Sequence, residues 1–514
     1  MRKETYVDNG PMLNAYPDSL GGKLSDIVRL LQKREFADAF QSFYILPSIY
    51  HSDLDRGFSV IDYGLNEQLA DKKDLENLKE LGLELKLDFI LNHASVLSKQ
   101  FQDVLRKGEE SEYKDFFINW NQFWEGCGKM TEEGYIMPRK ELIKDMFFRK
   151  PGLPILMVRF PDGKEVPYWN TFYQEVRHEA SGVKYLGQMD LNIKSPLVWK
   201  FYKDTINTLA GYGAKIIRLD AFAYAPKEPG KKNFLNDPET WELLNRVQKL
   251  ADKFELTLLP EIHASYEEKI YELLSQKGYM TYDFFLPGLI IDALERKNGE
   301  VLASWAKEIR EKKIRTVNML GCHDGIPLLD LKGLISEEQI ASLIDVIVKR
   351  GGYVKNLHGQ KNMYYQVNAT YYSALGEDDG KLLLARALQI FMPGKPQIWY
   401  LDLFAGKNDH EAVERAGSGG HKEINRTNLS LEQIEERLNF SVVRKQISML
   451  RFRNTFPAFG FEADFDMECK GAFLMICWKN QGYKAELSVN FRDGSFEILG
   501  MDQEENIIYE LKEA

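Results

Sequence analysis

The chain has 514 residues, more than one hydrophobic core usually supports, so two or three domains are expected. Apolar residues make up 44% and charged residues 28%, as in ordinary globular proteins, and no window approaches the roughly 18 apolar residues of a membrane span. The formal net charge of −10 argues against nucleic acid and anionic membrane as partners.

The N-terminal residues and the cysteines favour a cytoplasmic protein. Met1 is followed by charged residues, without the apolar stretch and small-residue cleavage site of a secretion signal. The four cysteines have neither the spacing of a metal site nor the density of a disulfide framework. We therefore expect a cytoplasmic enzyme in a reducing compartment.

Short apolar runs alternate with amphipathic helical stretches along the chain, which is typical of βα units around a parallel sheet. The runs that we interpret as strands are 12–16, 43–47, 85–91, 215–219, 256–260, 280–284, 316–321 and 397–401. Eight such units predict an α/β fold of the (β/α)8 TIM-barrel type.

Three segments do not fit the barrel repeat. Roughly 120 residues separate the third and fourth runs, too many for one helix and its loops, so we expect an inserted subdomain B over residues 98–192. A second long loop insertion, over about 325–374, follows the seventh run and is rich in Gly, Tyr and Asn. From 456 to 514, short alternating runs predict a small C-terminal β domain. The barrel would then comprise residues 1–97 and 193–455.

Three of the predicted strands are followed by a carboxylate, and a fourth by a histidine. Asp220, Glu261 and Asp324 come directly after, or within a few residues of, apolar runs, and His93 follows the run that ends at residue 91. Barrel enzymes carry their catalytic groups at these strand ends. Taken alone, each carboxylate could equally be a strand-end or helix-capping residue. The four segments together resemble, in order and spacing, the four signature regions of the α-amylase superfamily.

This resemblance implies transfer at an anomeric carbon. Such a reaction passes through an oxocarbenium-like transition state and uses one carboxylate as nucleophile and one carboxylic acid as proton donor. By the superfamily pattern, Asp220 is the nucleophile, Glu261 the general acid/base, and Asp324 the carboxylate that binds sugar hydroxyls. Arg218, two residues before Asp220, is expected to favour the ionised form of the nucleophile.

Further stretches resemble one branch of the superfamily, the sucrose phosphorylases and the related glucosylglycerol and glucosylglycerate phosphorylases. These stretches are residues 16–22, 55–63, 371–376, 405–409 and 423–426. The resemblance implies that Asp55 and Arg426 complete a closed pocket for one glucosyl unit, with His93 and His323 binding hydroxyls of the same sugar. For Arg426 a surface ion pair is the alternative interpretation.

A phosphorylase must attract inorganic phosphate to the glucosyl-enzyme, which calls for cations and hydroxyl donors. The loop Arg149–Pro154 resembles the basic loop of the family, and Tyr224 matches its phosphate-binding tyrosine. Either Arg149 or Lys150 could be the main contact, because lysine binds phosphate without the bidentate fork of arginine. A solvated basic pair is the alternative. Phosphate is a co-substrate here, and neither a cofactor nor a metal is expected.

The leaving-group side departs most from the sucrose phosphorylases. Met363 stands where the family has an Asp that binds fructose, next to Tyr364, Tyr365 and Gln366, and a thioether cannot accept hydroxyl hydrogen bonds as a carboxylate does. The freed alcohol could therefore be glycerol, glycerate, another polyol or a phosphorylated fructose. We place glycerol and glycerate first. A phosphosugar ranks lower, because the nearby cations are loop residues of the kind that usually only contact solvent.

These observations predict a retaining α-glucoside phosphorylase. It would convert an α-D-glucoside and phosphate to α-D-glucose 1-phosphate and the freed alcohol through a covalent glucosyl ester on Asp220. Its partners would be small carbohydrates and phosphate, and the protein a monomer or homodimer. The alternatives are an intracellular α-glucosidase or transglucosidase, and a non-catalytic barrel that serves as a scaffold.

Overall fold

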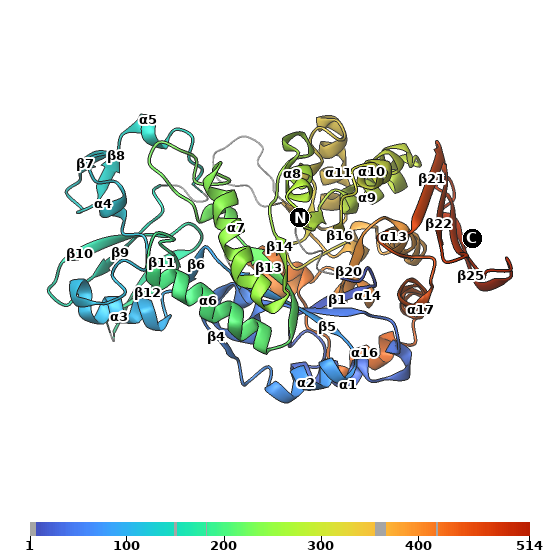
Figure 1. Cartoon of the computed structure of the whole chain (residues 1–514), viewed down its shortest axis with the longest axis horizontal. Coiled ribbons are helices and arrows are strands. Elements are labelled where there is room, and N and C mark those ends of the chain that lie inside the picture. Colours follow the sequence, from blue (N-terminus) through green and yellow to red (C-terminus); the bar gives the residue numbers. More distant parts are fainter. Residues whose placement is uncertain (1–6, 149–151, 181, 355–365, 418–419, 514) are drawn as a thin grey trace. The chain divides into compact units, whose positions relative to one another are not determined.

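The computed structural model describes residues 7–148, 152–180, 182–354, 366–417 and 420–513. The chain forms a (β/α)8 barrel and a C-terminal antiparallel sheet, which confirms the predicted fold class (Figure 1). It divides into two compact units. The first comprises Met1–Ile45, Lys73–Leu85 and Ile262–Ala514, and the second comprises Leu46–Lys72 and Lys86–Glu261. The domain limits predicted from the sequence follow a different division and stay predictions.

All eight apolar runs form the parallel barrel strands. These are β1 (Met12–Ala15), β2 (Ser42–Ile45), β5 (Glu84–Ile90), β13 (Ala214–Asp220), β14 (Thr257–Pro260), β15 (Thr281–Asp283), β16 (Thr316–Met319) and β20 (Lys395–Trp399). In the first unit, β1 pairs with β2 and β20, β20 with β16, and β16 with β15. In the second unit, β13 lies between β14 and β5. Most residues of these strands are buried, as expected for parallel strands covered on both faces.

The last barrel strand differs from its predicted range. β20 begins two residues earlier, at Lys395, and the predicted end at residues 400–401 belongs to the short helix α14 (Tyr400–Leu403). Aromatic and aliphatic residues continue without a break from strand to helix, so the apolar pattern carries no signal for the boundary.

Helices follow the barrel strands, as the alternating pattern predicts (Figure 1). The longer ones are α1 (Leu24–Leu31), α2 (Lys72–Glu80), α6 (Pro196–Gly211), α7 (Glu239–Ala251), α8 (Ile270–Gln276), α9 (Leu286–Arg296), α10 (Glu300–Glu311), α11 (Glu337–Lys349), α13 (Asp379–Phe391) and α17 (Ser441–Thr455). Local sequence signals determine where two of these helices begin. Pro196 occupies the first turn of α6, where its missing N–H sacrifices no hydrogen bond, and Ser336 forms a capping box with Gln339 at the start of α11.

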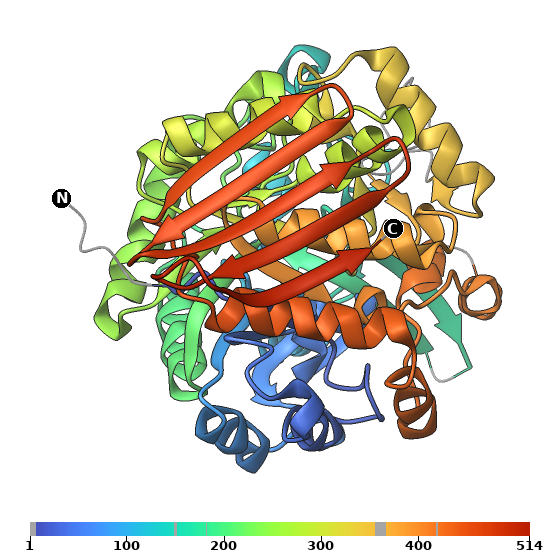
Figure 2. The same ribbon diagram turned by 90° about the vertical axis from the view of Figure 1, so that its right-hand side faces the viewer.

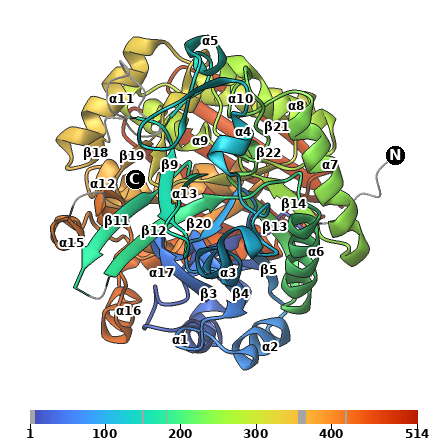
Figure 3. The same cartoon turned by 90° about the vertical axis from the view of Figure 1, so that its left-hand side faces the viewer.

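The chain between β5 and β13 contains a substructure with its own packing. It includes α3 (Lys99–Lys107) and the strands β9 (Ile155–Arg159), β10 (Glu165–Trp169), β11 (Gln174–Glu179) and β12 (Gly182–Asp190) (Figure 3). Trp120, Trp124 and Trp169 form a fully buried cluster there. β12 then pairs antiparallel with β6 (His93–Ser95), so that Asp190 lies opposite His93. The insertion thus ends beside a predicted site residue.

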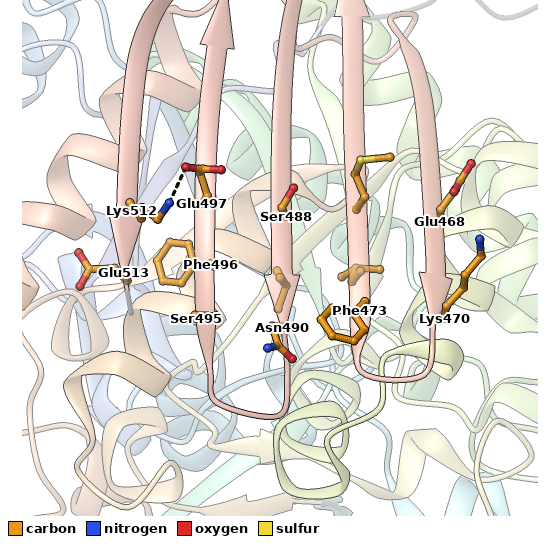
Figure 4. A pocket seen from close by; sticks show the side chains of 13 residues that line it. Glu468, Lys470, Phe473, Ser488, Asn490, Ser495, Phe496, Glu497, Lys512 and Glu513 are labelled. Carbon is orange, nitrogen blue, oxygen red and sulfur yellow. Dashed lines mark hydrogen bonds and ion pairs between the residues drawn. The ribbon is translucent and has the colours of Figure 1, made fainter.

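The C-terminal sheet is a five-stranded antiparallel meander (Figure 2). Its strands are β21 (Asp464–Lys470), β22 (Phe473–Asn480), β23 (Tyr483–Asn490), β24 (Ser495–Met501) and β25 (Ile507–Glu513). Along β22, Leu474, Ile476 and Trp478 are buried, whereas Phe473 and Met475 are exposed. The exposed face bears a shallow groove of about 440 Å³, and its lining includes an ion pair between Lys512 and Glu497 on neighbouring strands (Figure 4). In the described part of the chain, no helix is long and apolar enough to cross a membrane.

Candidate active site

Two predicted catalytic carboxylates lie at the ends of neighbouring strands in the second unit. Asp220 is the last residue of β13, and Glu261 directly follows β14. The strands are parallel, with Leu219 opposite Pro260, and the backbone N–H of Glu261 donates to the carbonyl of Leu219 at 3.2 Å. Parallel strands deliver their C-terminal residues to one edge of a sheet, so this pairing brings the two carboxylates together. Each side chain is 15% exposed.

Arg218 links these carboxylates to a third one. Its Nη1 donates to Asp220 Oδ1 and to Asp88 Oδ1, both at 2.7 Å, and its Nη2 lies 3.5 Å from Glu261 Oε1. The guanidinium is 4% exposed and the Asp88 side chain is fully buried. Arg218 therefore fixes one oxygen of the predicted nucleophile, and its positive charge favours the ionised carboxylate.

Asp88 was not among the predicted site residues. It sits on β5, where six of the seven residues are buried, and its side chain is fully buried. A carboxylate in that position needs a buried cation or several donors. The run 85–91 carries two charged residues, Lys86 and Asp88, and a carboxylate inside a predicted buried strand was the signal that could have identified it.

The backbone turns sharply after the nucleophile. Ala221 adopts a left-handed conformation with φ of 52°, which is unfavourable for a residue with a Cβ. A 3₁₀ turn (Phe222–Tyr224) follows, and the Tyr224 ring packs against Phe172 and Phe234 at centroid distances of 5.3 and 4.7 Å. Strain of this kind collects at functional sites, where the surrounding structure maintains it.

His93 and Asp55 are also in the second unit. The His93 ring is 3% exposed, donates from Nε2 to the Phe58 carbonyl at 2.9 Å and packs against Phe172. Burial lowers the pKa of His93, while Asp190, the Phe58 carbonyl and Asp55 act in the opposite direction. Its imidazole is therefore neutral near pH 7. Asp55 is exposed and has a positive φ of 48°.

In the first unit, Asp324 follows β16 and is surrounded by cations. Its Oδ1 lies 2.6 Å from Lys422 Nζ and 3.8 Å from Arg426 Nη2, and its Oδ2 lies 3.2 Å from His323 Nε2. Burial would raise the pKa of Asp324, but His323, Lys422 and Arg426 hold it well below its usual value. The carboxylate is therefore ionised across the physiological range.

The structure brings Asp324, His323 and Arg426 together as predicted. Arg426 is 2% exposed and donates from Nε to the His323 carbonyl at 2.8 Å, so the alternative of a surface ion pair is wrong. Lys422 was not predicted. It lies four residues before Arg426 in the same loop, and a lysine so close to a motif arginine was the available signal.

Gly325 allows the chain to pass close to Asp324. Its φ is +107°, and a Cβ there would meet the Val367 carbonyl oxygen at 2.5 Å. This close approach lets Asn368 of β19 (Gln366–Asn368) donate to the Asp324 carbonyl at 2.6 Å. Glycine is therefore required directly after the carboxylate.

Of the predicted phosphate and acceptor residues, Tyr224 and Gln366 are described. Arg149, Lys150, Met363, Tyr364 and Tyr365 lie outside the described residues. The Gln366 side chain lies 3.3 Å from His263 Nε2, while His263 Nδ1 lies 3.3 Å from Asp330 Oδ1. His263, which stacks on Phe284, was not among the predicted site residues.

Comparisons with known proteins identify relatives of this chain. The family model for the catalytic domain of alpha amylase matches residues 38–326. The chain is 53% identical to a sucrose 6(F)-phosphate phosphorylase of Ilumatobacter coccineus, over 96% of this chain and 98% of that protein. It is 31% identical to a glucosylglycerol phosphorylase of Marinobacter adhaerens, over 97% and 98%. The crystal structure of a sucrose 6F-phosphate phosphorylase from Thermoanaerobacter thermosaccharolyticum superposes with a TM-score of 0.88 at 34% identity, over 99% and 98%.

Proposed function

Because this chain belongs to the α-amylase family, as a glucoside phosphorylase, we propose that it is a sucrose 6F-phosphate phosphorylase. The reaction converts sucrose 6F-phosphate and inorganic phosphate to α-D-glucose 1-phosphate and fructose 6-phosphate. The observation that carries this proposal is the 53% identity, over nearly the whole chain, to a protein with that activity. The glucosylglycerol phosphorylase is 31% identical, so phosphorylated fructose now precedes glycerol and glycerate among the acceptors.

The first step of the proposed mechanism forms a covalent intermediate. The Asp220 carboxylate attacks the anomeric carbon, the bond from that carbon to the fructosyl oxygen breaks, and Glu261 gives its proton to the departing oxygen. Fructose 6-phosphate leaves, and a β-glucosyl ester on Asp220 remains. The hydrogen bond from Arg218 to Asp220 Oδ1 supports this role, because it holds the nucleophile ionised and in a fixed orientation.

In the second step, phosphate replaces the ester. A phosphate oxygen attacks the anomeric carbon, the ester bond breaks, and the Glu261 carboxylate accepts the proton of the attacking phosphate. Two inversions give retention of the α configuration. Tyr224 and the basic residues Arg149 and Lys150 are proposed to bind the phosphate.

Binding of the glucosyl unit is assigned by the family pattern. We propose that Asp324, His323 and Arg426 bind its hydroxyls, together with His93 and Asp55. The ionised state of Asp324, maintained by its cations, suits a carboxylate that accepts hydrogen bonds from sugar hydroxyls.

Three further expectations belong to the same proposal. The segment Met363–Gln366 is assigned to the acceptor. The enzyme uses phosphate as co-substrate, without a cofactor or metal. It acts in the cytoplasm as a monomer or homodimer.

The test is a panel of glucosides with and without phosphate: sucrose 6F-phosphate, sucrose, glucosylglycerol and glucosylglycerate. We expect phosphate-dependent release of α-D-glucose 1-phosphate, with the highest kcat/KM for sucrose 6F-phosphate. Glucose release at equal rates with and without phosphate would instead identify an α-glucosidase. A higher kcat/KM for one of the other three would replace the proposed substrate.

A further inference from the structure

A buried lysine in the second unit has no part in the reaction as described above. The Lys227 side chain is 1% exposed, and its ammonium contacts three oxygen acceptors. Nζ lies 2.7 Å from Asp190 Oδ2, 2.5 Å from the Tyr224 carbonyl oxygen and 3.3 Å from Asn92 Oδ1. An ammonium has three protons, so each of them has an acceptor.

The three acceptors come from three separate segments. Asn92 lies between β5 and His93, Asp190 is the last residue of β12, and the Tyr224 carbonyl ends the 3₁₀ turn after the nucleophile. Lys227 therefore ties the turn that carries Tyr224 to the two strand ends beside it. All these residues belong to the second unit.

Asp190 does not depend on Lys227 alone for hydrogen bonds. Its oxygens also accept from the Thr171 backbone N–H and Oγ1, both at 2.7 Å, and from Asn92 Nδ2 at 3.1 Å. The lysine adds a bond to the Tyr224 carbonyl, which connects this cluster to the turn after the nucleophile. This bond fixes the backbone of a residue whose ring is already packed between Phe172 and Phe234.

We propose that Lys227 is a positioning residue for phosphate, which holds the Tyr224 turn in the place where the phenol meets the attacking anion. The inference rests on the proposed phosphate-binding role of Tyr224. A ring fixed at both its backbone and its faces binds phosphate without an ordering cost, so loss of the tether weakens phosphate attack and leaves ester formation unaffected.

The test variant is Lys227→Met combined with Asp190→Asn. The double change removes both charges, because an unpaired buried carboxylate would itself destabilise the protein. The matched control is Thr171→Val, which removes a hydroxyl bond to Asp190 but leaves the lysine and its bond to Tyr224 in place. Thermal midpoints verify that each variant is folded.

The readout is the partition of the glucosyl-enzyme between phosphate and water. With α-D-glucosyl fluoride as donor, we expect the ratio of glucose 1-phosphate to glucose to fall about tenfold in the double variant, the scale of one charge-assisted contact. Fluoride release in the absence of phosphate should not change. The ratio for Thr171→Val should equal that of the wild type, even if its thermal midpoint falls.

Tyr224→Phe completes a mutant cycle with the double variant, in which the effects of the separate and the combined changes are compared. If Lys227 acts through Tyr224, adding the double change to Tyr224→Phe lowers the ratio further by less than about twofold. A lowered ratio in Tyr224→Phe with an unchanged ratio in the Lys227 variant would overturn this inference alone. An unchanged ratio in Tyr224→Phe itself would overturn the phosphate role of Tyr224. If the double change lowers the ratio by the same factor in Tyr224→Phe as in the wild type, Lys227 acts independently of Tyr224, which would contradict the proposal.

Discussion

Asp88→Asn is the most informative change near the nucleophile, because Asp88 binds Arg218, which in turn binds Asp220. The substitution keeps the side-chain size and one acceptor oxygen but removes the charge from a fully buried group bonded to Arg218 at 2.7 Å. A hydrogen bond between charged groups contributes about 1.5–3 kcal/mol. The amide retains part of it, so the expected loss is about 2 kcal/mol.

If Arg218 orients Asp220, the lost interaction free energy also destabilises the transition state of the reaction. About 2 kcal/mol corresponds to a decrease of about 30-fold in kcat/KM for phosphorolysis, with a lower thermal midpoint. Asp292→Asn is the control: Asp292 is also buried, but its nearest cation, Arg296, is exposed and 3.9 Å away. We expect kcat/KM of this control to stay near the wild-type value. A kcat/KM within threefold of wild type for Asp88→Asn would refute the reasoning.

Three further predictions concern individual groups. Asp220→Asn should lower kcat by several orders of magnitude while circular dichroism remains native, because an amide cannot form the ester, and activity within tenfold of wild type would contradict the assignment. Glu261→Gln should retain much more activity on α-D-glucosyl fluoride than on the natural glucoside, since fluoride leaves without protonation; equal losses would argue against the acid role. Lys422→Met should raise the pKa of Asp324, which Lys422 helps to depress. Ionised Asp324 stabilises the fold at pH values above its pKa in the unfolded chain, and this stability is lost as the pH falls through its pKa in the folded protein. The loss should therefore begin at a higher pH in the variant. Curves of thermal midpoint against pH that coincide on the acid side for variant and wild type would contradict this.

The barrel could be predicted because its strands are covered on both faces. Runs such as 85–91 and 215–219 consist mainly of aliphatic and aromatic residues, with two charged residues in each, and turn residues separate them from helical patterns. β20 begins and ends two residues earlier than predicted, since no polar residue separates it from α14.

The carboxylates at the strand ends were predictable for the same reason: the position of a residue after a buried run determines its place in a barrel. The residues that orient these carboxylates could not be predicted from the sequence. Asp88 contacts Arg218, 130 positions away, Lys422 contacts Asp324, 98 positions away, and Lys227 contacts Asn92, 135 positions away. Such pairings depend on tertiary structure.

The acceptor was the least predictable part. Met363 predicts a changed acceptor site, because a thioether cannot accept hydrogen bonds as a carboxylate does, but it does not indicate which acceptor is bound. The proposal of a phosphorylated fructose rests on the similarity of the whole chain to sucrose 6F-phosphate phosphorylases.

The most direct test of the central claim is to trap the glucosyl-enzyme and locate the ester. Incubation with 5-fluoro-α-D-glucosyl fluoride should label the protein once, and tryptic digestion places Asp220 in the peptide Leu219–Lys227, where it is the one side-chain carboxylate. The account predicts that mass spectrometry finds the fluoroglucosyl group on this peptide and that added phosphate releases it as the 5-fluoro analogue of glucose 1-phosphate. Label on a peptide that carries Glu261 or Asp324, or a labelled Leu219–Lys227 that water releases as fast as phosphate does, would contradict it.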